Sequence, residues 1–361
     1  MDLTAKSAAL KVKDKLYTLA SALDEAHMQA KLRPLVQARF GQSVEVDRVD
    51  IEILRRRNQR CVVRYHLALT GAAQQVWRVI GKVYKANQGR QVYDDMCTLW
   101  RHGFDREAGD GISMPEPYDF WDDLCLLLQE EVPGVPVKAF ARKAENTAAF
   151  RLLARTLVKL HRSPLAPGTP FTVRELLTRC HPRHEFLALA LPNLAPAIDY
   201  LVTTAFKLEA AFGRIAMTPL HGDFHLGQVH LEGNRAWLID YDALCYGDPA
   251  SDLGNLLVFL RGKVKRAPGL PVLLEAFLDE YFTFMDPAIR QRLPLHEGLT
   301  HLRRACKCLR LQEPGWEKKA QRMIARGLAC FEQMKASPAA FAALLPNALE
   351  EEDEEELWEA N

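Results

Sequence analysis

Residues 221–252 read HGDFHLGQVHLEGNRAWLIDYDALCYGDPASD, and this stretch decides the fold of the chain. It places an acid, Asp223, five residues before an amide, Gln228. A second acid, Asp240, follows twelve residues after that amide, beyond a turn at 232–234 and an apolar run. The pattern predicts a polar loop, a short hairpin and a second polar turn where the hairpin ends.

These three polar side chains suit one kind of chemistry. Phosphoryl transfer from a magnesium nucleotide needs an acid that orients a hydroxyl, and an amide oxygen and a carboxylate that hold the metal. We therefore predict Asp223 as the catalytic residue, and Gln228 and Asp240 as ligands of Mg²⁺.

Two other interpretations of the loop stay open at this level. Asp223 could simply cap the helix that follows such a loop. Alternatively, His221, Asp223 and His225 alternate along the chain, so a strand could present all three on one face, with His230 nearby. Such a cluster would fit a zinc-dependent hydrolase, provided that one metal position stayed open.

With these residues considered, the chain resembles the aminoglycoside phosphotransferase and choline kinase group of small-molecule kinases. The loop of that group usually reads His-Gly-Asp-x-His-x-x-Asn, followed by Ile-Asp and then Gly-Asp-Pro-x-x-Asp. The matching residues here are His221, Gly222, Asp223, His225, Ile239, Asp240, Gly247, Asp248, Pro249 and Asp252. Gln228 stands where most members carry Asn, and it offers the same amide oxygen on a stem one methylene longer. The resemblance gives Asp248 and Asp252 roles in holding the fold.

The resemblance implies an α+β, two-lobed protein-kinase-like fold, with a small antiparallel-sheet N-lobe and a larger, mostly helical C-lobe. We expect four parts: a helical extension at 1–43, a nucleotide-binding N-lobe at 44–131, a helical C-lobe with the catalytic loop at 132–345, and an acidic disordered tail at 346–361.

Apolar spacing and breaker residues predict the individual elements. The expected strands are 44–54, 60–69, 75–84 and, near the sheet edge, 124–129, with a charged turn at 55–59. The expected helices are 3–40, 91–102, 137–162, 172–180, 197–212, 250–261, 271–284, 293–311 and 315–334. Two prolines and a glycine make 130–136 the expected linker.

A lysine on the third strand is the predicted phosphate ligand. Lys82 is favoured over Lys85, because the strand pattern sets its direction. Many relatives pair this lysine with a glutamate on the next helix. Here that helix offers Asp94 or Asp95, and we take Asp95 as the predicted partner.

Two more residues complete the predicted nucleotide site. The chain lacks a glycine-rich phosphate loop, so the turn that ends at Arg60 would bring guanidinium groups near the triphosphate. The resemblance places a hinge that reads the adenine edge where the linker begins, and we take Glu130 as its predicted residue.

Bulk composition excludes some classes of protein. A net charge of +1 argues against nucleic-acid binding, which needs a basic surplus. No apolar run reaches the roughly 18–20 residues that span a bilayer, and the N-terminus does not resemble a secretory signal. The eight cysteines are scattered singly, apart from Cys306 and Cys308, which favours a reducing, cytoplasmic location. We expect neither a nucleic acid nor a membrane as partner.

The predicted activity is Mg²⁺-dependent transfer of the γ-phosphate of ATP or GTP to a hydroxyl of a small molecule. The helices at 250–335 carry many basic groups, which would repel a polycationic aminoglycoside. A sugar or related metabolite, or an anionic acceptor, is therefore expected. The alternative from another class is a nucleotide-binding pseudokinase, which Gln228 and the missing glycines would suit.

Overall fold

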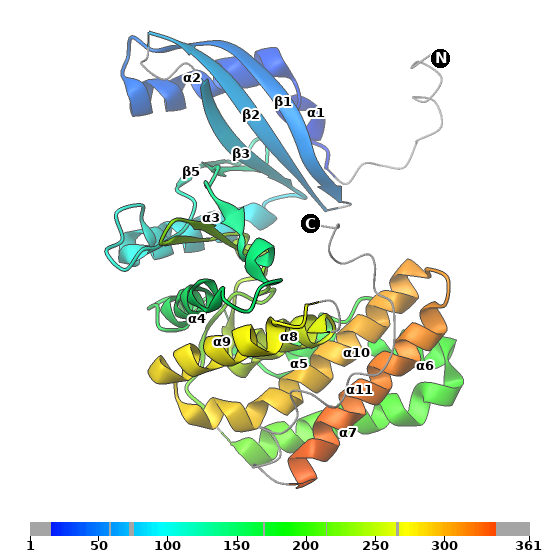
Figure 1. The fold of residues 1–361 in the computed structure, drawn as a ribbon. Coiled ribbons are helices and arrows are strands. Elements are labelled where there is room, and N and C mark those ends of the chain that lie inside the picture. Colours follow the sequence, from blue (N-terminus) through cyan, green and yellow to red (C-terminus); the bar gives the residue numbers. More distant parts are fainter. Residues whose placement is uncertain are drawn as a thin grey trace. The chain divides into compact units, whose positions relative to one another are not determined.

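A computed structural model describes residues 16–57, 59–71, 76–168, 170–213, 215–264 and 267–336. The chain forms two compact units (Figure 1). We call the first the sheet unit; it comprises Met1–Ala108 and Ser113–Val132. The second, the helical unit, comprises Gly109–Ile112 and Pro133–Asn361.

The sheet unit contains one antiparallel five-stranded sheet with the order β1-β2-β3-β6-β5. Its strands are β1 (Glu45–Arg57), β2 (Arg60–Thr70), β3 (Val76–Tyr84), β5 (Pro117–Trp121) and β6 (Leu126–Glu130). Its helices are α1 (Leu19–Ala22), α2 (Glu25–Phe40), α3 (Gln88–Leu99) and the π-helix η1 (Trp100–Phe104).

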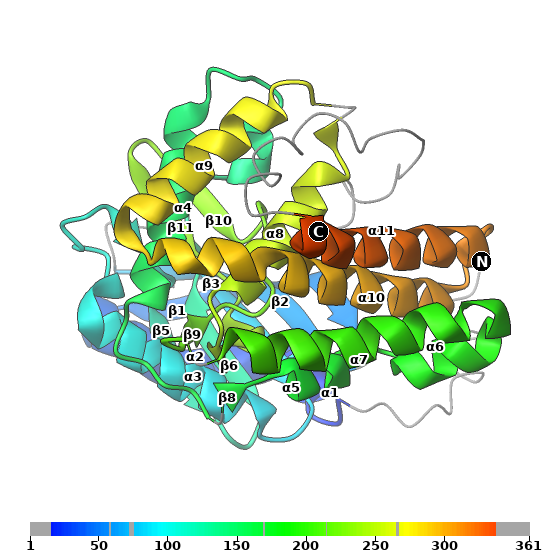
Figure 2. The same cartoon turned by 90° about the horizontal axis from the view of Figure 1, so that it is seen from below.

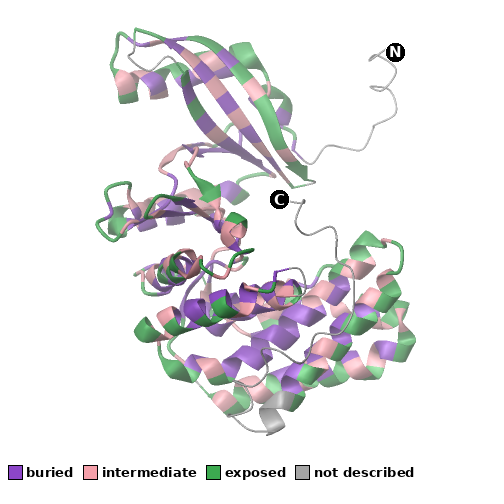
Figure 3. Cartoon of the chain, viewed as in Figure 1, coloured by how far each residue is buried: buried purple, intermediate pink, exposed green. Residues whose placement is uncertain are grey.

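Alternation along the strands builds the core of the sheet unit. Buried and half-buried residues alternate along β2, because successive side chains point to opposite faces (Figure 3). One buried cluster joins Val63 and Tyr65 of β2 with Met28 and Leu32 of α2. The α2 helix starts where the Asp24 carboxylate accepts the His27 N–H at 2.8 Å.

The helical unit is built mainly from eight helices within its described residues. They are α4 (Thr147–His161), α5 (Val173–Thr178), α6 (His184–Ala190), α7 (Ala195–Phe212), α8 (Ala250–Arg261), α9 (Leu270–Phe284), α10 (Leu293–Leu311) and α11 (Trp316–Ala336). Figure 2 shows α7, α10 and α11 lying side by side. Their shared core includes Leu201, Leu302 and Ile324.

Short strands and turns complete the helical unit. The hairpin of β10 (Val229–Glu232) and β11 (Arg235–Leu238) is flanked by β7 (Val135–Pro136). A second sheet has the order β8-β12-β9, from Pro170–Phe171, Cys245–Gly247 and Thr218–Leu220. The remaining elements are β4 (Ile112–Ser113) and the 3-10 turns η2 (Val137–Phe140), η3 (Pro192–Leu194), η4 (Tyr241–Ala243) and η6 (Pro287–Arg292).

The fold class predicted from the sequence is confirmed: an antiparallel sheet lies at the N-terminal side and the rest is mostly helical. The helices expected at 250–261 and 293–311 have those bounds. The four-part division into 1–43, 44–131, 132–345 and 346–361 stays a prediction. Much of its first part and nearly all of the acidic tail lie outside the described residues.

Other element predictions were wrong in detail. The strand expected near the sheet edge is β6, the second strand from that edge, but the edge strand β5 itself was missed. The turn expected at 55–59 is shorter, because β1 continues through three arginines and Arg57 pairs with Arg60. The helix expected at 137–162 is interrupted between η2 and α4.

The predictions of helices also missed one break and one whole helix. The segment expected to be helical from residue 3 is described only from residue 16, and it breaks between α1 and α2. The α6 helix was not expected at all. Among the described residues, no single helix is long and apolar enough to cross a membrane; α6 with the segment Pro192–Phe212 meets that test only as a pair bent by 119°.

Candidate active site

The loop at 221–228 is held from beneath by a buried carboxylate. It lies between β9 and β10, and Asp252 on α8 accepts two of its backbone N–H groups. The Oδ2 atom of Asp252 lies 2.6 Å from the nitrogen of His221, and Oδ1 lies 2.8 Å from that of Gly222. Because each oxygen takes one N–H, the carboxylate fixes the start of the loop.

A second layer of contacts holds Asp252 itself. Its Oδ2 atom lies 3.2 Å from Nε2 of His161, and Nδ1 of that ring lies 2.8 Å from the Tyr281 hydroxyl. Burial acts to raise the pKa of Asp252, but the hydrogen bonds and charges of His161 and His221 outweigh it. The pKa of Asp252 is therefore lowered, and the group is a carboxylate at neutral pH.

Gly222 is required by the shape of the loop. Its φ angle is +77°, in the left-handed region that residues with a Cβ rarely adopt. An added Cβ would lie 2.1 Å from the carbonyl oxygen of Ala243. The loop therefore passes directly against the turn that follows Asp240.

Two hydrogen bonds tie the loop to the turn at Asp240. Nε2 of His221 donates to the carbonyl of Ile239 at 2.9 Å, and the Ile239 N–H donates to the carbonyl of Gln228 at 2.9 Å. Asp240 itself has a left-handed backbone, with φ of 67° and ψ of 66°. Asp223, Gln228 and Asp240 thus belong to one hydrogen-bonded frame, which we call the catalytic frame.

Exposure differs among the three polar groups of the catalytic frame. Asp223 is exposed and Asp240 is half-buried, whereas only 7% of Gln228 is exposed. An exposed acid can meet an incoming acceptor, and a buried amide has a fixed orientation. The roles assigned to these residues from the sequence stay predictions.

His225 orients the amide of Gln228. Its Nδ1 accepts the Gly227 N–H at 3.0 Å, and its Nε2 lies 3.2 Å from Nε2 of the Gln228 amide. Burial lowers the pKa of His225, although Asp223 opposes that shift, so the ring is neutral at pH 7. The ring also stacks on Phe259 at 5.8 Å between centroids. The His225 ring therefore helps to position Gln228.

The zinc alternative fails on geometry. Both ring nitrogens of His221 are engaged, Nε2 with Ile239 and Nδ1 with the Asp223 N–H. His230 lies on β10 opposite Trp237. Throughout the described part of the chain, no three His, Cys, Asp or Glu side chains are grouped to hold a metal ion. A Mg²⁺ site made of one amide oxygen and one carboxylate, with phosphate oxygens and water as the other ligands, needs no cluster of three such side chains.

The sheet unit contains the residues predicted to bind the nucleotide. Lys82 lies on β3 between Val62 and Leu127, and only 5% of it is exposed. Its competitor Lys85 follows the end of β3. A lysine buried inside a sheet has a fixed direction, which favours Lys82 as the predicted phosphate ligand.

The predicted partner of Lys82 lies on α3. Asp95 is buried, and its Oδ1 accepts a hydrogen bond from the Gln91 amide at 3.0 Å. Burial raises the pKa of the Asp95 carboxyl, and the Gln91 hydrogen bond only partly opposes this shift. The pairing of Asp95 with Lys82 stays a prediction.

Glu130 and Arg60 differ in burial. Glu130 is buried at the end of β6; its N–H donates to the Glu116 carbonyl at 2.9 Å, and its carboxylate pairs with Arg106. The predicted contact of this hinge with the adenine edge stays a prediction. Arg60 is half-buried at the first position of β2, opposite Arg57 and Tyr84.

Sequence reasoning missed Arg179. This residue follows the C-terminus of α5, and its guanidinium donates to the carbonyls of Gly222 and Ala243, each at 3.1 Å. It thus joins the loop to the turn from a third direction. An arginine at a helix end carries no motif, so only the fold reveals this role.

Comparison with known protein families gives a match over the segment that contains the catalytic frame. A model described as "Phosphotransferase enzyme family" matches residues 101–295. No curated protein sequence shows a significant match to the chain.

Several solved structures share the fold. A choline kinase, LicA from Streptococcus pneumoniae, has a TM-score of 0.55 at 15% identity, covering 84% of this chain and 99% of its own. A thermostable mutant of the aminoglycoside phosphotransferase APH(4)-Ia, in a ternary complex with ADP and hygromycin B, has a TM-score of 0.56 at 13% identity, covering 83% and 98%. The amicoumacin kinase hAmiN, bound to AMP-PNP, Ca²⁺ and Ami, has a TM-score of 0.53 at 16% identity, covering 80% and 89%.

Proposed function

This chain belongs to the phosphotransferase enzyme family, and we propose that it transfers the γ-phosphate of ATP or GTP to a hydroxyl group of a small molecule, with Mg²⁺ as cofactor. The family match confirms the resemblance inferred from the loop motif. The observation that carries the proposal is the catalytic frame, in which hydrogen bonds through Ile239 lock an exposed acid to two oxygen ligands.

In the proposed reaction, the acceptor hydroxyl donates a hydrogen bond to the carboxylate of Asp223. The hydroxyl oxygen forms a bond to the γ-phosphorus, while the bond from that phosphorus to the oxygen bridging to the β-phosphate breaks. The electron pair of the broken bond leaves with ADP or GDP. The hydroxyl proton passes to Asp223 and then to solvent, late in the transfer.

The oxygen ligands of the catalytic frame fit Mg²⁺. Magnesium prefers hard oxygen donors, and Gln228 and Asp240 offer an amide oxygen and a carboxylate beside the loop. When bound there, the metal ion neutralises charge on the β- and γ-phosphates. The half-buried position of Asp240 and the packing of His225 against Gln228 support this assignment.

For the nucleotide, we propose Lys82 as the ligand of the α- and β-phosphates, with Asp95 as its partner. Arg60 would add positive charge near the triphosphate, and the backbone around Glu130 would contact the base. The buried, strand-fixed position of Lys82 supports its part. We also propose a cytoplasmic location, which the free state of all eight cysteines suits.

The acceptor is proposed to be a sugar or a related hydroxylated metabolite. The relatives named above act on chemically different acceptors, so their shared fold leaves the acceptor open. Basic side chains on the late helices disfavour a polycation.

The test is nucleotide consumption by the purified full-length chain with Mg²⁺ and a panel of hydroxylated metabolites. Asp223→Asn should lower kcat at least about a hundredfold while nucleotide binding persists, because the amide cannot accept the proton. Asp199→Asn, an exposed change on α7, is the matched control and should leave kcat intact. A pseudokinase would bind the nucleotide and show no turnover in any form, which would refute the proposal.

A further inference from the structure

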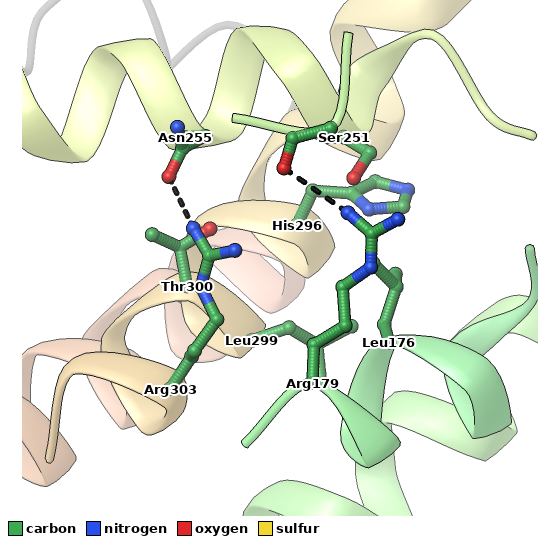
Figure 4. Close-up of a pocket in the computed structure, with 9 residues that line it drawn as sticks. Leu176, Arg179, Ser251, Asn255, His296, Leu299, Thr300 and Arg303 are labelled. Atoms are coloured by element: carbon green, nitrogen blue, oxygen red, sulfur yellow. Dashed lines mark hydrogen bonds between the residues drawn. The ribbon is translucent and has the colours of Figure 1, made fainter. Parts of the chain in front are cut away.

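A small cavity lies beside the catalytic loop, within the helical unit. Gly222, the residue before Asp223, forms part of its wall, and the other walls come from α5, α8 and α10 (Figure 4). The room inside it for the centre of a water-sized molecule is about 20 Å³, and it is open to solvent.

Two guanidinium groups line this cavity from different elements. Arg179 follows α5 and Arg303 lies on α10, and Figure 4 shows both side chains extending toward α8. No carboxylate belongs to the cavity lining, among the residues that the structure describes. Two like charges around one small space repel each other, and an anion bound between them would relieve that repulsion.

Each guanidinium keeps unused donors. Arg179 uses one hydrogen bond from each terminal nitrogen, to Gly222 and Ala243, and Arg303 donates to the Asn255 side chain. A guanidinium has five N–H groups in a planar fork that matches the oxygens of a carboxylate or phosphate. The hydroxyls of Ser251 and Thr300 in the same lining can donate as well.

The surroundings of Arg303 are consistent with a site for negative charge. Burial lowers the pKa of its guanidinium; Asp223 opposes this shift and Arg179 adds to it. The group remains protonated at neutral pH, and the negative charge of Asp223 helps to stabilise this half-buried cation. A bound anion would supply a second compensating charge.

We propose that this cavity binds an anionic group, a carboxylate or a phosphate, carried by the acceptor itself. The inference rests on the proposed function and narrows it: the substrate is a hydroxylated metabolite with its own negative charge, held by Arg179 and Arg303 while its hydroxyl faces Asp223. A choline-like or aminoglycoside-like cation would meet repulsion in the same cavity.

The test uses acceptor trios that differ only in charge: glycerol, glycerate and glycerol 3-phosphate, and glucose, gluconate and glucose 6-phosphate. With saturating Mg-ATP, kcat/KM for an anionic member should exceed that of its neutral partner at least about tenfold, the gain expected from one charged hydrogen-bonded contact. Arg303→Gln should lower that ratio at least about tenfold. Arg310→Gln, an exposed change of the same charge on the same helix, should leave the ratio unchanged.

A binding measurement separates the two proposals. Inorganic phosphate should bind the chain saturated with Mg-AMP-PNP, measured by calorimetry, and Arg303→Gln should weaken that binding at least about tenfold, with Arg303→Lys intermediate. Phosphate binding without turnover of any acceptor would refute the kinase proposal alone. Preferred turnover of neutral acceptors, or equal losses on neutral and anionic acceptors in Arg303→Gln, would overturn the anionic site. So would absence of phosphate binding to the wild-type chain.

Discussion

Asp252→Asn is the substitution that most directly tests how the catalytic loop is held. The carboxylate has only 1% exposure, and it accepts two loop N–H groups and contacts His161. An asparagine has the same shape but one acceptor oxygen, so its NH₂ group must face either His221 or Gly222. One loop N–H then faces this NH₂ group instead of an oxygen, so two donors meet. The negative charge beside His161 is also lost.

The magnitude follows from these contacts. A hydrogen bond to a charged group contributes about 1.5–3 kcal/mol, and Asp252→Asn loses at least one of them. For a unit of this size, 1 kcal/mol corresponds to a change of about 2–4 °C in Tm, so Tm should fall by about 3–12 °C. Because Asp223 directly follows Gly222, the loosened loop should also lower kcat by up to about a hundredfold.

Thermal unfolding followed by circular dichroism gives the first quantity, and turnover measured well below the lowered Tm gives the second. Asp199→Asn, exposed on α7, controls for the chemical change and should leave Tm within about 2 °C. A drop smaller than about 3 °C for Asp252→Asn, with normal kcat, would show that the loop does not depend on this carboxylate, and the reasoning would be refuted.

Two further predictions concern α8 and its surroundings. The pKa of Asp248 is lowered, since His296 and Arg292 outweigh the opposing effect of burial, and the pKa of Asp252 is lowered too. Both carboxylates therefore stabilise the fold above the unfolded pKa of about 3.9, and that contribution is lost as pH falls through their folded values. Tm should be level near neutral pH and fall below about pH 4; an equal Tm at pH 3 and pH 7 would contradict this. Gly254→Ala should lower the free energy of unfolding by about 1–3 kcal/mol, because its Cβ would lie 2.9 Å from His296 on α10. The control Gly262→Ala, whose Cβ would have nothing closer than 3.7 Å, should leave that free energy nearly unchanged. Urea titration of both variants measures the difference.

Regular periodicity explains which elements the sequence revealed. α8 and α10 have apolar residues at helical spacing between clear start and stop signals, so their bounds could be predicted. β5 begins with a proline, is only five residues long and contains an aspartate, so it gives a weak strand signal. The break between η2 and α4 also escaped, since apolar spacing persists on both sides of it.

The catalytic frame was predictable because its residues are close in the sequence. Asp223, Gln228 and Asp240 sit at fixed spacings around one hairpin, and the fold brings their backbone together as the motif requires. The lining of the cavity was not predictable in this way. Arg179 is 44 residues from Asp223, and among the basic residues of α10 only the fold distinguishes Arg303, inside the cavity, from its exposed neighbour Arg310.

The same turn of α8 lines the cavity and holds the catalytic loop. Ser251 and Asn255 line the cavity, and Asp252 between them holds the loop that carries Asp223. Residues this close on a rigid helix cannot shift independently, so redesign of acceptor preference along α8 would disturb the chemistry as well. The exposed turns of α10 offer more room for divergence. Descendants of this enzyme that acquire new acceptors should therefore differ first along α10 and leave α8 nearly constant.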